Sequence, residues 1–228
     1  MKKFVFGVLF SMAATGVASA ANLGPAGDAS AGKGKAAACV ACHGEGGNSV
    51  VPTFPKLAGQ GERYLYKQMK DIQCGFLSAD DQKARKCTGR SVPTMAGQLD
   101  GKSDQDLADI AAYFASQPHS GGQARKDDML ARGESIYRAG IPSVGVAACM
   151  GCHSPTGLGN APAGFPAIGG QHADYIEAQL RAFRAAADGS TENIRNNDGD
   201  TQMMRSVVKH MSDNDIKAVA NYIAGLYQ

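Results

Sequence analysis

Two short segments of the chain combine a pair of cysteines with a histidine: Cys39-Val40-Ala41-Cys42-His43 and Cys149-Met150-Gly151-Cys152-His153. Two thiols about one helical turn apart can form thioethers with the two vinyl groups of a porphyrin, and the histidine that follows then presents its imidazole to the iron. The sequence therefore predicts two covalently bound haem c groups. The expected attachment residues are Cys39, Cys42, Cys149 and Cys152, and the expected axial ligands are His43 and His153.

Two other uses of paired cysteines fit this sequence less well. A zinc ribbon places its second Cys pair roughly 15 to 20 residues after the first, whereas Cys39 and Cys149 are 110 positions apart. A thioredoxin-like redox pair lies in a strand–helix–strand frame, and the sequence shows no convincing alternating strand pattern. Haem attachment is the favoured interpretation.

The two motifs belong to a repeat that spans the chain. The other matched segments, offset by 109 to 111 positions, are Phe54–Gln60 with Phe165–Gln171 and Ser103–Leu107 with Ser212–Ile216. Such self-similarity indicates a tandem duplication of one module of about 100 residues. The expected organisation is a signal peptide at 1–20, an N-terminal domain at 21–117, a linker at 118–124 and a C-terminal domain at 125–228.

Helices are expected to position these residues in each copy. A first helix starts near Ser30 in one copy and near Asp128 in the other and runs into the Cys motif. Apolar residues at helical spacing then predict a middle helix and a last helix, and the last helix begins at a capping box (Ser103 or Ser212). The predicted fold is mainly α.

The ligand on the far side of each iron separates electron carriers from enzymes, because an open position invites substrate chemistry. Met95 lies eight residues before Ser103, and Met204 lies eight residues before Ser212. This shared register predicts Met95 and Met204 as sixth ligands and favours Met204 over Met203. The remaining histidines, expected to be solvent-exposed, are His119, His172 and His210.

The first 20 residues have the pattern of a secretory signal peptide. Lys2 and Lys3 precede the apolar run Phe4–Val17, and small residues at 18–20 offer a cleavage site. Export predicts a periplasmic protein. Removal of the two lysines leaves 21 basic residues against 21 acidic residues, and a neutral chain is a poor binder of nucleic acid. No later apolar run is long enough to predict a membrane span.

The chain resembles the two-haem cytochrome c4 family over essentially its whole mature length. The resemblance rests on both Cys-x-x-Cys-His motifs and on the segments 54–64, 103–113, 164–175 and 197–205. It implies two tandem class I cytochrome c domains related by a pseudo-twofold axis, with the haem edges facing each other. It also implies a periplasmic electron carrier, often in peripheral membrane association, that supplies haem-copper terminal oxidases.

The resemblance also implies neighbours for the haem. Pro55 and Pro166 correspond to the proline whose carbonyl accepts the imidazole N–H in single-haem class I cytochromes, which fixes the ring and strengthens it as a donor. The alternative is that both prolines only shape a turn. Tyr64 and Tyr175 match across the copies, and they either contact haem propionates or lie in the core.

Cys74 and Cys87 have no counterpart in the second copy. Four of the six cysteines are assigned to haem, which leaves these two in a chain predicted to be exported. We expect a disulfide between them that restrains the segment before Met95. Two unpaired thiols are the alternative.

The expected function is electron transfer between an upstream electron donor and a membrane-bound terminal oxidase. One alternative is the haem subunit of a larger dehydrogenase, which has similar motifs. Another is a dihaem enzyme such as a peroxidase or thiosulfate dehydrogenase, which the methionine in each copy disfavours because such chemistry needs an open or labile iron.

Overall fold

The computed structural model describes residues 24–226, so the expected signal peptide lies outside the described residues. Within that range the regular structure is helical, and β-pairing is limited to two isolated bridges. The N-terminal half contains α1 (Ala29–Lys35), α2 (Val40–His43), α3 (Glu62–Gly75), α4 (Ala79–Arg85) and α5 (Asp104–Ala115). The C-terminal half contains α6 (Leu130–Ala139), α7 (Met150–His153), α8 (Ala173–Ala187), α9 (Met203–Val208) and α10 (Asp213–Gly225). The mainly α fold predicted from the sequence is confirmed.

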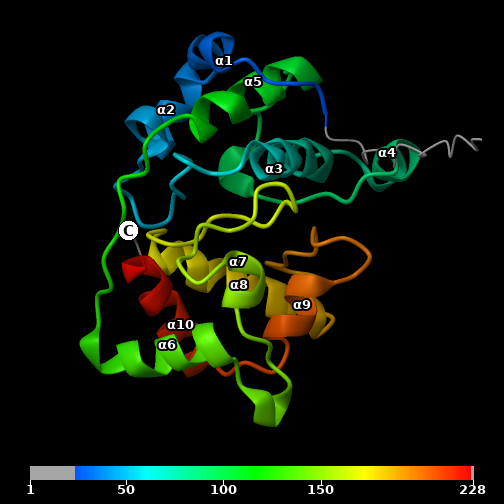
Figure 1. Cartoon of the computed structure of the whole chain (residues 1–228). Coiled ribbons are helices and arrows are strands. Elements are labelled where there is room, and N and C mark those ends of the chain that lie inside the picture. Colours follow the sequence, from blue (N-terminus) through cyan, green and yellow to red (C-terminus); the bar gives the residue numbers. More distant parts are fainter. Residues whose placement is uncertain (1–23, 227–228) are drawn as a thin grey trace, which may run out of the picture.

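The two halves pack their helices in the same way. The last helix of each half, α5 or α10, contacts both the first helix (α1 or α6) and the long middle helix (α3 or α8). Figure 1 shows the halves one above the other, joined by a single extended segment. Each last helix begins at a capping box, in which Ser103 or Ser212 exchanges hydrogen bonds with the aspartate three residues later. The duplicated sequence thus folds into two domains of matching architecture.

The helix that each domain buries most deeply is its last one. Leu107, Ile110 and Phe114 of α5 are at most 1% exposed, and α10 buries Ile216 and Val219 to the same extent. These residues recur at the spacing of one helical face, so burying that face removes a continuous apolar surface from water. The last helix is therefore the centre of each domain core.

A glycine in the first helix permits its close crossing with the last one. A Cβ atom on Gly32 would lie 2.0 Å from the carbonyl oxygen of Asp109, and one on Gly133 would lie 2.2 Å from that of Ala218. Backbone cannot yield at such distances, so only glycine allows α1 to approach α5 and α6 to approach α10 this closely.

The approach to the Cys motif differs between the domains. In the N-terminal domain a 3₁₀ turn at Ala37–Cys39 joins α1 to α2. In the C-terminal domain α6 ends at Gly140, which has φ 71°, and a loop with an Ile141–Val146 bridge precedes α7. The expectation that the first helix runs into the Cys motif is therefore wrong for the second copy, because the positive φ of Gly140 ends the helix.

No helix within residues 24–226 combines the length and the apolar composition that crossing a bilayer requires.

Candidate haem centres

The four cysteines of the two motifs form no disulfide and lie at one-turn helices. Cys39 precedes α2 and Cys42 lies within it, and Cys149 and Cys152 occupy the matching places at α7. Burial raises the pKa of the Cys39 thiol, and it raises the pKa of Cys149 to about 11. A reactive redox pair needs a lowered thiol pKa, so the environment of these thiols argues against a thioredoxin-like role.

Each motif histidine is buried and held by a proline carbonyl. His43 and His153 are both 8% exposed. Nδ1 of His43 lies 2.9 Å from the carbonyl oxygen of Pro55, and Nδ1 of His153 lies 3.0 Å from that of Pro166. A carbonyl accepts only, so Nδ1 carries the proton and Nε2 keeps its lone pair for a metal.

The surroundings of both imidazoles favour their neutral form. Burial lowers the pKa of His43 and of His153, and the hydrogen bond to the proline carbonyl opposes that shift without reversing it. A neutral imidazole with a fixed tautomer is the form that ligates iron. The arrangement of these histidines fits a haem iron.

The two candidate methionines lie at the edges of the domain cores. Met95 ends the 3₁₀ turn Pro93–Met95 and packs against the buried cluster of Ile72, Leu99 and Leu107. Met204 lies on α9 and packs against the core of the C-terminal domain, whereas its neighbour Met203 is 40% exposed. The structure thus turns Met204 toward the domain core and Met203 toward solvent; ligation of iron by Met204 stays a prediction.

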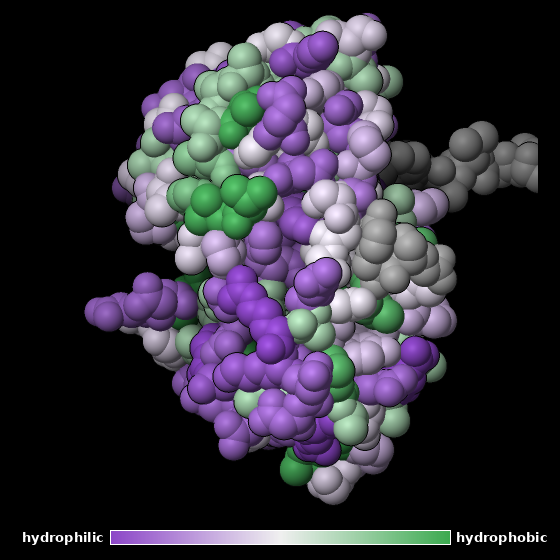
Figure 2. All heavy atoms as spheres, turned by 90° about the vertical axis from the view of Figure 1, so that its left-hand side faces the viewer, coloured by the Kyte–Doolittle hydropathy of each residue, from purple (hydrophilic) through white to green (hydrophobic). Residues whose placement is uncertain are grey.

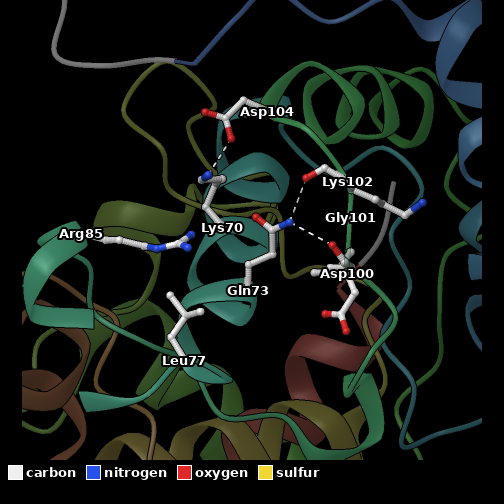
Figure 3. Close-up of a pocket in the computed structure, with 9 residues that line it drawn as sticks. Lys70, Gln73, Leu77, Arg85, Asp100, Gly101, Lys102 and Asp104 are labelled. Carbon is white, nitrogen blue, oxygen red and sulfur yellow. Dashed lines mark hydrogen bonds and ion pairs between the residues drawn. The ribbon is translucent and has the colours of Figure 1, made fainter. Parts of the chain in front are cut away.

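The chain is tied to α3 on both sides of Met95, by a disulfide before it and by hydrogen bonds after it. A disulfide joins Cys74, near the end of α3, to Cys87, with their Cα atoms 6.3 Å apart. Gln73 Nε2 donates to the carbonyl oxygens of Leu99 and Lys102 at 2.9 and 3.1 Å. Figure 3 shows the two Gln73 hydrogen bonds and the pairing of Lys70 with Asp104 beside a cavity. The volume of this cavity is about 360 Å³. The loop from Met95 to α5 is therefore held against α3.

Glutamine side chains join the two domains in a pseudo-symmetric pair of contacts. Gln60 Nε2 donates to the carbonyl oxygen of Ala167 at 2.8 Å, and Gln60 Oε1 accepts from the Ala167 N–H at 2.9 Å. Gln171 makes the same two bonds to the backbone of Lys56, both at 2.9 Å. Each glutamine side-chain amide thus pairs with the N–H and C=O of one residue in the other domain, as a neighbouring backbone segment would.

Two buried arginines cross the same interface. Arg90 and Arg195 are 9% and 7% exposed. Arg90 donates to Gln68 and Gln179 and to the Tyr175 hydroxyl. Arg195 donates to the same two glutamines and to the Tyr64 hydroxyl. Each arginine therefore contacts the tyrosine of the other domain.

The groups that accept hydrogen bonds from these two arginines indicate whether a haem fits beside them. Within residues 24–226 the hydrogen-bond acceptors of both guanidiniums are neutral side chains, including Asn197. A buried charge is stable when it is paired. The two propionate carboxylates of a haem would supply that charge, so the polar centre of the interface fits the group that the motifs predict.

Some of these interface residues could be found in the sequence and others could not. Tyr64, Tyr175, Gln60 and Gln171 carry a signal, since they match across the copies. Arg90 and Arg195 lie outside the matched segments.

The expectation that His119 and His172 are solvent-exposed is wrong, because both are half-buried at the linker. There His172 Nε2 contacts the Ser49 carbonyl oxygen at 2.9 Å. His210 is exposed as expected.

Comparison with known proteins places this arrangement among relatives. The sequence profile of the Cytochrome c family matches residues 29–118 and 130–226. Cytochrome c4 from Azotobacter vinelandii is 49% identical over 227 residues, covering 100% of both chains. The crystal structure of reduced recombinant cytochrome c4 from Pseudomonas stutzeri matches with a TM-score of 0.79 and 51% identity, covering 89% of this chain and 100% of that one. The thiosulfate dehydrogenase electron acceptor of Thiomonas intermedia is 33% identical over 194 residues, covering 83% of this chain and 79% of that protein.

Proposed function

The chain belongs to the cytochrome c4 family of electron carriers, and on this premise we propose that it passes electrons through a periplasmic respiratory chain to a haem-copper terminal oxidase. Its two cytochrome c domains bind two covalently attached haem c groups, and the protein is not an enzyme. A bound haem c supplies a one-electron couple between ferric and ferrous iron. What we propose beyond the family is which residues bind the haems, which proteins exchange electrons with this chain and in which compartment it works.

The first part of the proposal assigns the haem-binding residues. Thioether bonds to the porphyrins are assigned to Cys39 and Cys42 in the N-terminal domain and to Cys149 and Cys152 in the C-terminal domain. The axial ligands are assigned as His43 with Met95 and His153 with Met204. The position of the four cysteines at one-turn helices outside the disulfide, the oriented imidazoles and the inward Met204 support this assignment.

The protein's own groups favour electron transfer without ligand exchange. The Pro55 and Pro166 carbonyls keep each imidazole in one tautomer and orientation, so the ring can stay in place when the charge of the iron changes. The bonds from α3 hold the segment that follows Met95. A fixed ligand set lowers the structural rearrangement that accompanies each electron.

The observation that carries the proposal is the polar contact between two domains that each hold a Cys-x-x-Cys-His motif. Gln60, Gln171, Arg90 and Arg195 bond across the interface, so the two domains form one body. Two redox centres fixed in one body can exchange an electron without dissociation of the protein. That property suits a carrier that receives electrons at one domain and releases them at the other.

Stopped-flow spectroscopy with the purified holoprotein tests this function. The ferrous protein is mixed with a membrane haem-copper oxidase and, separately, with peroxide. We expect rapid oxidation of both haems by the oxidase and no steady turnover of peroxide. Faster oxidation by peroxide than by the oxidase, with sustained turnover, would overturn the proposal.

A relative points to a candidate for the upstream donor. The Thiomonas intermedia protein is named as an electron acceptor of thiosulfate dehydrogenase. A dehydrogenase of that class is therefore a candidate donor for this chain, which would then be its acceptor. Reduction of this protein by a thiosulfate dehydrogenase plus thiosulfate, and its absence with thiosulfate alone, would support this arrangement.

Export and peripheral membrane association belong to the proposal as well. The signal-peptide pattern at 1–20 supports the export, and the resemblance to the cytochrome c4 family implies the peripheral association. Cell fractionation with and without residues 1–20 tests the export. A haem-free cytoplasmic product from the truncated gene is the expected result.

A further inference from the structure

A second cavity lies on the linker side of the domain junction. Its volume is about 490 Å³, and it is lined by Lys56, by residues 122–125, by residues 170–173 and by Ala224. Both domains and the segment that joins them thus contribute to its wall. None of these residues is among those assigned to haem attachment or iron ligation. Figure 2 shows this face of the molecule, where hydrophilic side chains gather at the level of the junction.

Lys56 brings a buried positive charge to this cavity. The residue is 9% exposed, and its Nζ donates to the carbonyl oxygen of Gly121 in the linker. Among residues 24–226 it forms no ion pair with a carboxylate, and burial lowers its pKa. An ammonium group buried beside a carbonyl alone lacks the countercharge that such groups usually have.

Further positive charge surrounds the same space. Arg125, the first residue after the linker, lies in the cavity wall, and its Nη1 pairs with the Asp174 carboxylate at 3.1 Å. His172 is also part of the wall, and His119 is close enough for the two imidazoles to influence each other. The 15-residue helix α8 begins at Ala173 without a side-chain cap, so its first N–H groups add partial positive charge. The cavity wall therefore carries Lys56, Arg125 and His172, while the Asp174 carboxylate is engaged by Arg125.

We propose that this cavity binds one small oxyanion, of the size and charge of sulfate or phosphate, which Lys56 and Arg125 hold between the domains. Such an ion supplies the charge that Lys56 lacks, and the first N–H groups of α8 are suited to bind its oxygens. Because Lys56 belongs to the N-terminal domain and Arg125 and His172 lie on the other side of the linker, the bound ion also strengthens the junction.

His172 makes the binding depend on pH. Burial lowers its pKa, as do the neighbouring charges of Lys56 and Arg125, while the Ser49 carbonyl and Asp174 act in the opposite direction. His119 faces the same group and shares the effects of burial and of Lys56. When the pH falls through the pKa of His172, a further positive charge joins the site. Oxyanion affinity therefore rises as the pH decreases.

Calorimetric titration of the holoprotein with sulfate tests the proposal, because the charge of sulfate is constant between about pH 5 and 8 and every change with pH then comes from the protein. Ionic strength is held constant with sodium chloride. We expect one saturable site per molecule and tighter binding at pH 5.5 than at pH 8 by a factor of about 3 to 10, since one added charge at close range contributes roughly 1 kcal/mol.

Three variants and one control locate the site. Lys56→Met is expected to weaken sulfate binding at least tenfold, and Arg125→Gln, at an exposed side chain that tolerates change, at least threefold. His172→Gln retains a donor for the Ser49 carbonyl and is expected to remove most of the pH dependence. Lys33→Met, at an exposed lysine of α1, leaves the affinity unchanged. Absence of saturable binding to the wild type, or wild-type affinity in both Lys56→Met and Arg125→Gln, overturns the proposal. If Lys56→Met does not fold, Arg125→Gln decides the outcome.

Discussion

The side-chain amide of Gln171 holds the backbone of Lys56 by both of its ends, across the boundary between the two domains. Its Nε2 donates to the Lys56 carbonyl oxygen and its Oε1 accepts from the Lys56 N–H, both at 2.9 Å. Gln171 and Lys56 are 6% and 9% exposed, so water cannot easily replace these bonds. Gln60 repeats the contact on Ala167, which makes the junction a pair of side-chain-to-backbone clamps.

Gln171→Ala is expected to lower the free energy of unfolding by about 2 to 4 kcal/mol, because it leaves a buried N–H and a buried C=O without partners. Denaturant unfolding followed by circular dichroism measures the loss. Gln98→Ala, at an exposed glutamine of the Met95–Ser103 loop, is the control and should change stability by less than about 0.5 kcal/mol. Equal effects of the two substitutions would show that the clamp contributes nothing.

Met204→Ala is expected to abolish the near-infrared absorption of sulfur-ligated ferric haem for one of the two haems and to lower its reduction potential, because the thioether ligand raises the potential. Met95→Ala should do the same for the other haem. Met203→Ala is the matched control, since that side chain is 40% exposed and should leave the band intact. Loss of the band in Met203→Ala alone would show that the repeat register assigns the wrong methionine.

Replacement of Cys74 and Cys87 by serine is expected to destabilise the protein by about 3 kcal/mol, the chain-entropy value for a loop of this length. The N-terminal haem should lose its methionine band at a lower denaturant concentration than the C-terminal haem, because the bond restrains the segment before Met95. Thiol labelling of the denatured, unreduced wild type provides the direct check. Two labelled cysteines would contradict the disulfide.

Two glycines of α1 should respond in opposite ways to alanine. Gly32→Ala places a Cβ atom 2.0 Å from the Asp109 carbonyl oxygen and should cost about 1 to 3 kcal/mol or more. Gly34 has no atom within 4 Å of its built Cβ, so Gly34→Ala should be neutral or stabilise the helix by about 0.5 to 1 kcal/mol. Thermal unfolding of the two variants measures the contrast, and equal melting temperatures would refute the close crossing of α1 and α5.

The ionisation of Asp109 makes the stability of the folded protein depend on pH in the acid range. Its carboxylate accepts hydrogen bonds from Lys35 Nζ, from the Asp28 N–H and from Gln105 Nε2, and these bonds lower its pKa to about 2. The pKa of this carboxyl is lower in the folded protein than in the unfolded chain, where it is near 4. The ionised carboxylate therefore stabilises the fold above about pH 4, and this stabilisation is lost as the pH falls toward 2. Asp109→Asn should therefore reduce the fall in the urea midpoint between pH 4.5 and 2.5. An unchanged pH profile in Asp109→Asn would remove Asp109 from the acid response.

Local patterns in the sequence were sufficient for the chemistry and the architecture. Cys-x-x-Cys-His fixes the residue types and the spacing that haem attachment needs, and the spacing depends only on neighbouring positions. The repeat allows the two copies to be compared, and the comparison shows Met95 and Met204 at the same distance from the capping boxes at Ser103 and Ser212. Periodic apolar residues predict the last helix of each copy, since one face of a helix must be buried whatever it packs against.

The interface between the copies was decided by the tertiary structure. Arg90 and Arg195 have no common place in the repeat, yet each reaches the tyrosine of the opposite domain. His119 and His172 resemble surface histidines in the sequence, and only the return of the linker against the loop after His43 buries them. A periodic pattern records how a segment packs within its own domain, whereas contacts between domains join residues more than 80 positions apart and leave no regular spacing. For that reason the sequence could single out candidate haem ligands, whereas it gave no sign of the polar junction and its cationic cavity.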